Sequence, residues 1–236
     1  MSEVSAERLR FALTSPHTSK DTTGFLWRPA REEGGAALVL GHGAGANAAH
    51  ATMLALGRGL AGRGHPVLTF NFGYAEAGRR VPDPTAWLES AFRDAVGAAR
   101  EAFGPGRPLI LGGRSMGGRI ASQVAARGEP CAGLALLGYP LHPARWPERL
   151  RTAHWPQIRV PVLFVQGDRD RLCPLTRLDE QRRAHLAVPV DVDVLPGADH
   201  AFATRGDGGP PRPQTLERVA GDVATWAARL PVTAAT

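Results

Sequence analysis

The stretch Pro108-Leu-Ile-Leu-Gly-Gly-Arg-Ser-Met-Gly-Gly-Arg119 decides how the rest of the chain is interpreted. Its apolar run, Leu109–Leu111, predicts a buried strand that stops at the glycine pair after it. The small and apolar side chains from 120 to 124 predict a closely packed helix. Between the two, Gly113-Arg-Ser-Met-Gly117 places Ser115 at the tip of a sharp turn. The stretch therefore predicts a strand, a tight turn and a helix in immediate succession.

A serine in this setting is typical of the nucleophile elbow, whose pattern is G-x-S-x-G. Glycines suit the turn because Cβ atoms there would keep the strand and the helix apart. The first N–H groups of the helix point toward an oxyanion that forms beside Ser115. A bare G-x-S-x-G also occurs by chance in a chain with 28 glycines. The flanking strand and helix therefore carry the prediction of a nucleophile.

The size and composition of the chain narrow the class of protein. Its 236 residues suit one α/β domain, 1–236, with a sizeable core. No apolar run approaches the roughly 20 residues of a membrane span, and the first eight residues are polar. The two cysteines do not form a disulfide framework, so we expect a cytoplasmic protein. The net charge of +6 comes from scattered arginines, so we expect no nucleic-acid partner.

Apolar strands and helical segments alternate along the chain. This alternation predicts an α/β fold with a mostly parallel central sheet and helices on both faces. We expect an edge hairpin at about residues 8–28 and a flexible tail at 231–236. We also expect a helix from Ala48 to Leu60, with Asn47 as its N-cap.

Polar residues follow the carboxyl ends of several predicted strands, where parallel sheets gather their functional groups. They are His42, Ser115, Asp168, Asp170, Asp199 and His200. A serine hydroxyl becomes a nucleophile when an imidazole takes its proton, and a carboxylate then holds the imidazole tautomer. The residues alone leave the choice among the three aspartates open. We interpret His42 as a structural hydrogen-bonding residue.

These motifs, taken in order, resemble the α/β-hydrolase superfamily and in particular its small, dienelactone-hydrolase-like branch. The resemblance spans about residues 24–230 and is carried by five segments. They are Gly41-His-Gly-Ala-Gly45, Asn71-Phe-Gly-Tyr74, Gly113-Arg-Ser-Met-Gly-Gly-Arg119, Gly138-Tyr-Pro-Leu-His-Pro143 and Gln166-Gly-Asp-Arg-Asp170. Dienelactone hydrolases have a cysteine nucleophile where this chain has Ser115. The resemblance therefore favours a serine esterase over a dienelactone hydrolase.

The resemblance implies a role for each candidate residue. The chain order in this fold is serine, acid, histidine, which implies His200 as the base. Gly167-x-x-Asp170 followed by a proline matches the acid turn of these enzymes, so Asp170 is favoured and Asp168 is the alternative. The N–H groups of Ala44 and Met116 are the expected oxyanion hole. We expect neither a cofactor nor a metal.

The segment between the predicted strands at 134–137 and 162–165 is too short for a large lid. We therefore expect an open site for a small soluble ester or thioester. Arg114 is a candidate ligand for a substrate carboxylate, or alternatively half of a structural ion pair. Tyr139 is a further candidate substrate ligand. Other aromatic candidates for the pocket wall are Tyr74, Trp146, Trp155 and Phe202.

The sequence therefore predicts hydrolysis of a small-molecule ester by a Ser-His-Asp acyl-enzyme mechanism, in a monomer or homodimer without a membrane partner. The alternative is a hydrolase-fold binding or scaffold protein with little or no activity. A nucleotide loop at Gly41-x-Gly43-x-Gly45 is disfavoured because it lacks the lysine of a P-loop and the glycine spacing of a dinucleotide site.

Overall fold

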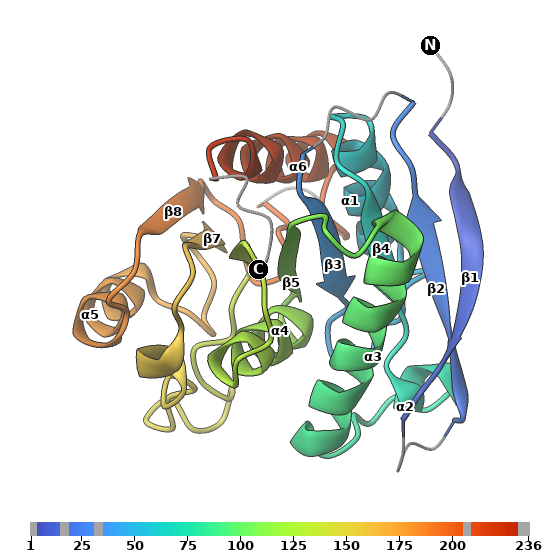
Figure 1. Ribbon diagram of the computed structural model, residues 1–236. Coiled ribbons are helices and arrows are strands. Elements are labelled where there is room, and N and C mark those ends of the chain that lie inside the picture. The colour runs from blue at the N-terminus through green and yellow to red at the C-terminus, as the bar shows by residue number, and fades with distance from the viewer. Residues whose placement is uncertain (1–3, 15–18, 31–34, 205–208, 231–236) are drawn as a thin grey trace.

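The structure is a computed structural model that describes residues 4–14, 19–30, 35–204 and 209–230. Its strands are β1 (Ala6–Ala12), β2 (Asp21–Trp27), β3 (Ala37–Gly41), β4 (Val67–Phe70), β5 (Leu109–Arg114), β6 (Gly133–Leu137), β7 (Val162–Gly167) and β8 (Val190–Leu195). They form one sheet in the order β1-β2-β4-β3-β5-β6-β7-β8 (Figure 1). Strand β2 runs antiparallel to both neighbours, and the pairs from β4 to β8 are parallel. The sheet is thus mostly parallel, as predicted.

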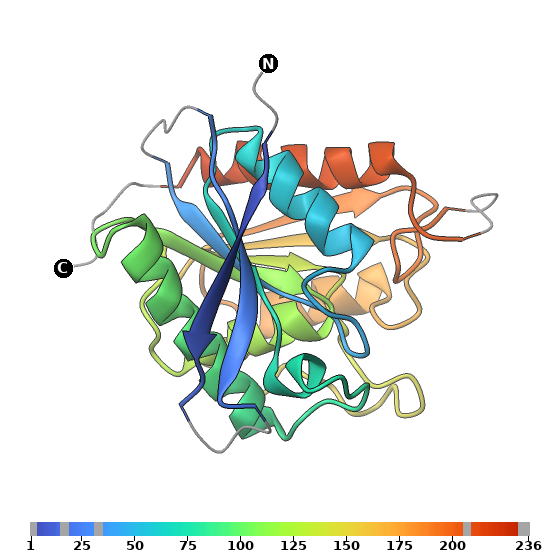
Figure 2. The same cartoon turned by 90° about the vertical axis from the view of Figure 1, so that its right-hand side faces the viewer.

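Helices cover both faces of this sheet. They are α1 (Ala51–Ala61), α2 (Gly73–Glu76), α3 (Thr85–Phe103), α4 (Met116–Ala126), α5 (Leu175–His185) and α6 (Pro213–Ala227). Figure 2 shows α1 and α6 on one side of the sheet and α3 and α4 on the other. In β3, Leu38 and Leu40 join the core beneath α1 and α6, and Val39 joins the core beneath α3 and α4. This alternation follows from the two-residue period of a strand.

Two local expectations change in the structure, those for the end of β5 and the start of α1. Strand β5 runs through Gly112 and Gly113 to Arg114, because both glycines continue the pairing with β3 and β6. Helix α1 begins at Ala51 with His50 as its N-cap, not Asn47, and the His50 imidazole accepts from Thr52 N–H. Asn47 instead belongs to the turn before the helix, where its carbonyl accepts from His50 N–H. The edge hairpin spans β1 and β2, and the expected tail at 231–236 lies outside the described residues.

The connection between β6 and β7 sets how open the carboxyl edge of the sheet is. Residues 138–161 are all described, and they contain one 3₁₀ turn, η1 (Trp155–Gln157), and no α-helix. The described chain therefore carries no large lid over this edge.

Candidate active site

Ser115 stands between β5 and α4 in a strained backbone conformation. Its φ is 50° and its ψ is −111°, a region that costs a residue with a Cβ about 1–3 kcal/mol. Two hydrogen bonds hold the turn. Ser115 N–H donates to Leu137 O at 2.9 Å, and Arg119 N–H donates to Ser115 O at 3.1 Å. The strain lifts the serine side chain out of the strand and presents it at the edge of the sheet.

Close contact between this turn and β3 explains two of the glycines. A Cβ on Gly117 would lie 2.0 Å from Gly41 O, and a Cβ on Gly113 would lie 2.2 Å from the same oxygen. Gly113 also has a φ of 143°, which side chains disfavour. The turn can therefore approach β3 at this distance only while both positions lack a side chain.

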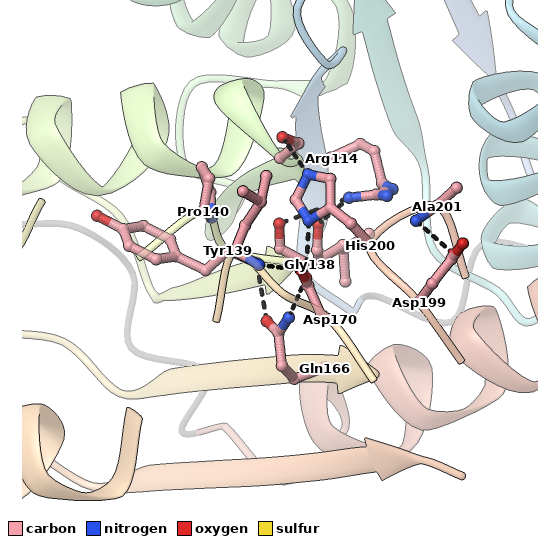
Figure 3. A network of polar contacts seen from close by, with 12 residues as sticks. Arg114, Gly138, Tyr139, Pro140, Gln166, Asp170, Asp199, His200 and Ala201 are labelled. Carbon is pink, nitrogen blue, oxygen red and sulfur yellow. Dashed lines mark hydrogen bonds and ion pairs between the residues drawn. The ribbon is translucent and has the colours of Figure 1, made fainter. Parts of the chain in front are cut away.

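Ser115, His200 and Asp170 form a continuous hydrogen-bonded chain. Ser115 Oγ lies 2.9 Å from His200 Nε2, and His200 Nδ1 lies 2.7 Å from Asp170 Oδ2 (Figure 3). The Asp170 carboxylate accepts at Nδ1, so the imidazole proton belongs there and the Nε2 lone pair faces the hydroxyl. The His200 side chain is 28% exposed, whereas that of Asp170 is 0% exposed. The histidine is thus accessible from solvent, and its carboxylate partner is sealed beneath it.

The other two candidate aspartates serve the backbone. Asp168 Oδ1 accepts from Gly197 N–H at 2.7 Å, which joins the turns after β7 and β8. Asp199 Oδ1 accepts from the N–H groups of residues 201 and 203, which closes its own turn. Of the three carboxylates, Asp170 is the one that contacts the imidazole of His200.

Gln166 is a site residue that the sequence analysis missed. Its side chain is fully buried at the end of β7. Tyr139 N–H donates to Gln166 Oε1 at 2.9 Å, so the amide group is oriented with Nε2 toward Asp170 Oδ2, 2.5 Å away. Leu172 N–H donates to the other oxygen of Asp170 at 2.8 Å. The signal that would have revealed Gln166 is a polar residue that prolongs the apolar run Val162–Val165.

The two expected oxyanion donors belong to residues beside the serine. Ala44, Ser115 and Met116 line one hollow of about 330 Å³. Met116 is the first residue of α4, where N–H groups have no partner within the helix. Gly43, next to Ala44, brings the β3 loop against the elbow, because a Cβ there would lie 3.6 Å from Ser115 Cβ. Both backbone segments thus lie beside the Ser115 side chain at this hollow.

His42 is sealed inside the protein and does not join this chain of hydrogen bonds. Its side chain is fully buried, and burial lowers its pKa to about 4. Phe72 N–H donates to His42 Nε2 at 3.1 Å, so the proton sits on Nδ1, which donates to Gly43 O at 2.8 Å. The neutral imidazole therefore ties the loop after β3 to the loop after β4.

Arg114 faces the protein's own main chain. Its guanidinium donates to Leu137 O at 3.1 Å and stacks 4.4 Å above the ring centre of Phe202. Burial lowers the pKa of Arg114 to about 10, against the opposing effect of Asp170 and Asp199. The guanidinium stays charged at neutral pH, and these contacts give it a structural place. The sequence analysis named Arg114 as a candidate ligand for a substrate carboxylate, with a structural ion pair as the alternative, whereas the contacts seen are to a carbonyl group and an aromatic ring.

The expectation that Tyr139 binds substrate is wrong in this structure. Its side chain is fully buried against Trp155 and Phe164, because it fills the core beside α4. The hydroxyl donates to Arg151 O at 2.6 Å. Tyr74, Trp155 and Phe202 are fully buried as well, and Trp146, which is 46% exposed, does not line the hollow beside Ser115.

The described ranges contain neither a cluster of metal ligands nor a helix suited to a bilayer. In residues 4–14, 19–30, 35–204 and 209–230, no three histidine, cysteine, aspartate or glutamate side chains gather as metal ligands would. Within the same ranges, none of the helices combines the length and the apolar character needed to cross a bilayer.

Known proteins resemble the chain over most of its length. A family described as an alpha/beta hydrolase domain matches residues 34–228. A dienelactone hydrolase from Anabaena variabilis has a TM-score of 0.74 and 19% identity, over 97% of this chain and 99% of that one. A serine hydrolase without a lid from Xanthomonas campestris has a TM-score of 0.69 and 19% identity, over 99% and 98%. The esterase domain of a Rhodothermus marinus protein has a TM-score of 0.71 and 18% identity, over 97% and 100%.

Proposed function

The chain belongs to the family of alpha/beta hydrolase domains, and from this premise we propose that it is a serine hydrolase of small esters or thioesters. One observation carries the proposal. Ser115, His200 and Asp170 come from three separate turns, yet they meet in one hydrogen-bonded chain with distances of 2.9 and 2.7 Å. A buried carboxylate, an oriented imidazole and a partly exposed turn serine are the parts that acyl transfer needs.

In the first half of the reaction, Ser115 Oγ attacks the carbonyl carbon while His200 Nε2 takes its proton. The N–H groups of Met116 and Ala44 stabilise the oxyanion of the tetrahedral intermediate. His200 then gives its proton to the leaving oxygen or sulfur, which departs and leaves an ester on Ser115. Asp170 keeps the Nδ1 proton in place and stabilises the imidazolium.

In the second half, a water molecule takes the position of the leaving group. His200 removes a proton from this water while the water oxygen attacks the acyl carbon. His200 then returns the proton to Ser115 Oγ as the acid is released. An open carboxyl edge suits this reaction with a small soluble substrate, because water enters without the movement of a lid.

A fluorophosphonate probe tests the proposal directly, since it reacts with activated serines. We expect peptide mass spectrometry to find the adduct on Ser115, and we expect labelling to disappear in Ser115→Ala and His200→Ala. Circular dichroism would establish that both variants are folded. A folded wild-type protein that takes no label, and that cleaves no ester in a broad panel, would overturn the proposal in favour of a binding or scaffold protein.

A further inference from the structure

Two arginines line the hollow that contains Ser115. The hollow of about 330 Å³ has Ala44, Ser115 and Met116 on its wall, and Arg119 and Arg151 line it as well. Its volume is at the lower end for small-molecule sites, which suits a short acyl group. Two guanidinium groups beside the nucleophile call for an explanation that the acyl-enzyme mechanism itself does not give.

Arg119 stands on the same face of α4 as the nucleophile. It follows Ser115 by four residues, and its N–H donates to Ser115 O at 3.1 Å. Side chains four apart lie one above the other on a helix and lean toward its N-terminus, here toward Ser115. The Arg119 guanidinium is half-buried, and its hydrogen bond is to the neutral amide of Gln123 at 3.3 Å.

Arg151 is fixed in place through its main chain. Its N–H donates to Leu141 O at 2.8 Å, and its carbonyl accepts from Tyr139 Oη at 2.6 Å. Its guanidinium reaches the carbonyl of Pro140 at 3.5 Å and is half-buried. Tyr139, which does not reach the hollow, thus positions a residue that does.

The charges of these two arginines are not balanced locally. Within the described residues, neither forms an ion pair with a carboxylate. Asp83 also lines the hollow, but it is paired with Arg79, and nearby Glu89 is paired with Arg127 at 3.2 Å. Burial lowers the pKa of Arg119 against the opposing effects of Tyr139 and Glu89, and burial together with Arg119 lowers the pKa of Arg151. Both remain charged, so the hollow presents two partly desolvated cations that an anion would stabilise.

The position of His200 indicates which part of the substrate carries the anion. His200 lines a second hollow of about 430 Å³, which shares Leu172 with the first. The leaving group takes its proton from His200, so it departs on the side of the second hollow. The acyl chain then occupies the first hollow, beside Arg119 and Arg151.

We infer that the substrate is a monoester or monothioester of a short dicarboxylic acid, whose free carboxylate binds Arg119 and Arg151. This inference rests on the proposed serine-hydrolase function. In the reaction, the bond from the acyl carbon to the leaving oxygen or sulfur breaks. The alcohol or thiol takes its proton through His200, and water supplies the new hydroxyl group. The products are the dicarboxylic acid and the free alcohol or thiol.

Two esters of equal chain length isolate the effect of the carboxylate. The mono-4-nitrophenyl ester of glutaric acid is the anionic substrate, and 4-nitrophenyl valerate is the neutral one, with spontaneous hydrolysis subtracted for both. We expect kcat/KM to favour the anionic ester by about tenfold or more, the usual strength of a charged hydrogen bond. We expect Arg119→Gln and Arg151→Gln each to lower that preference, the ratio of kcat/KM for the two esters, about tenfold. Arg145→Gln is the matched control, because Arg145 is exposed and does not line the hollow.

Protection from the fluorophosphonate probe gives a readout that needs no turnover. We expect glutarate to slow the labelling of Ser115 in the wild type and in Arg145→Gln, but not in Arg119→Gln or Arg151→Gln. Two results would overturn the inference and leave the serine-hydrolase function intact. One is labelling of Ser115 that glutarate does not slow, and the other is a kcat/KM for the anionic ester that is no higher than that for the neutral ester. Failure of labelling and of both esters would instead remove the proposed function and the inference with it.

Discussion

Close main-chain contacts occur in both halves of the site, but the half around β3 and the elbow presents Ser115 through them, whereas the half around β7 and β8 adds the side-chain hydrogen bonds that hold His200. In the elbow half, residues 41–45 and 112–119, glycines allow backbone to touch backbone and a strained turn presents Ser115. In the acid–base half, residues 166–172 and 195–202, the amide of Gln166 and three aspartates hold the turns and His200. The contrast teaches that backbone packing positions Ser115, whereas side-chain hydrogen bonds orient His200 beside it.

The same contrast separates two histidines that both follow strands. His42 in the elbow half is fully buried and hydrogen-bonded to backbone on both sides of its ring. His200 in the acid–base half is partly exposed and lies between a hydroxyl and a carboxylate. Both residues are histidines that follow the carboxyl end of a strand. The groups that contact each ring therefore decide which of the two is placed to transfer a proton.

Gly117→Ala should break the elbow half, with the largest effect of the changes considered. The new Cβ would lie 2.0 Å from Gly41 O, and backbone on both sides prevents an easy adjustment. We expect the free energy of unfolding to fall by about 3 kcal/mol or more, which denaturant titration would measure. Gly97→Ala in α3 is the control, because no atom lies within 4 Å of its Cβ. That variant should be neutral or more stable by about 0.5–1 kcal/mol, and an equal loss in both variants would refute the close-approach argument.

Acidification should lower the free energy of unfolding through His42, which lies in the elbow half. Its pKa is lowered from 6.5 to about 4 in the folded protein, so the unfolded chain takes up the proton first as pH falls. The contribution of the neutral His42 to the free energy of unfolding is therefore complete above pH 6.5. It is lost as the pH falls from 6.5 to about 4, and the total loss is at most about 3 kcal/mol. His154, whose pKa burial also lowers to about 4, acts in the same direction.

Unfolding titrations at several pH values between 7 and 4.5 would check this effect. We expect wild type and His42→Gln to differ most at pH 7 and to converge as the pH falls. His154→Gln is the comparison for the second histidine. Parallel pH dependences in wild type and His42→Gln would show that His42 does not stay neutral in the folded protein.

The two halves also differ in how far they could be predicted from the sequence. The elbow was predictable, because an apolar run, glycines and a serine are adjacent in the chain and local sterics dictate the turn. The mostly parallel sheet followed from alternating apolar strands and helical segments. The N-cap of α1 was wrongly predicted because Asn47, a favoured cap residue, belongs to the turn before the helix and His50 caps the helix instead. The acid–base half depends on pairs 29 and 30 residues apart, Asp168 with Gly197 and Asp170 with His200. Only the resemblance favoured Asp170. Gln166 had a weak local signal as the polar end of an apolar strand, but its partners Tyr139 and Asp170 could not be read from that signal.

Gln166→Leu tests the acid–base half alone. We expect its effect to be smaller than those of Gly117→Ala and of acidification. It removes one donor to Asp170 Oδ2 and leaves Tyr139 N–H without its acceptor, while the elbow half stays unchanged. We expect kcat for ester hydrolysis to fall about tenfold at nearly constant KM, because the substrate does not touch Gln166 but the His200 imidazole loses part of its support. Asp168→Ala loses a hydrogen bond to Gly197 in the same half without touching Asp170, so its kcat should change by less than about threefold. Both variants are to be assayed well below their unfolding temperatures. Equal losses of kcat in the two would mean that general loosening of these turns, and not the amide of Gln166, controls the alignment of Asp170 with His200.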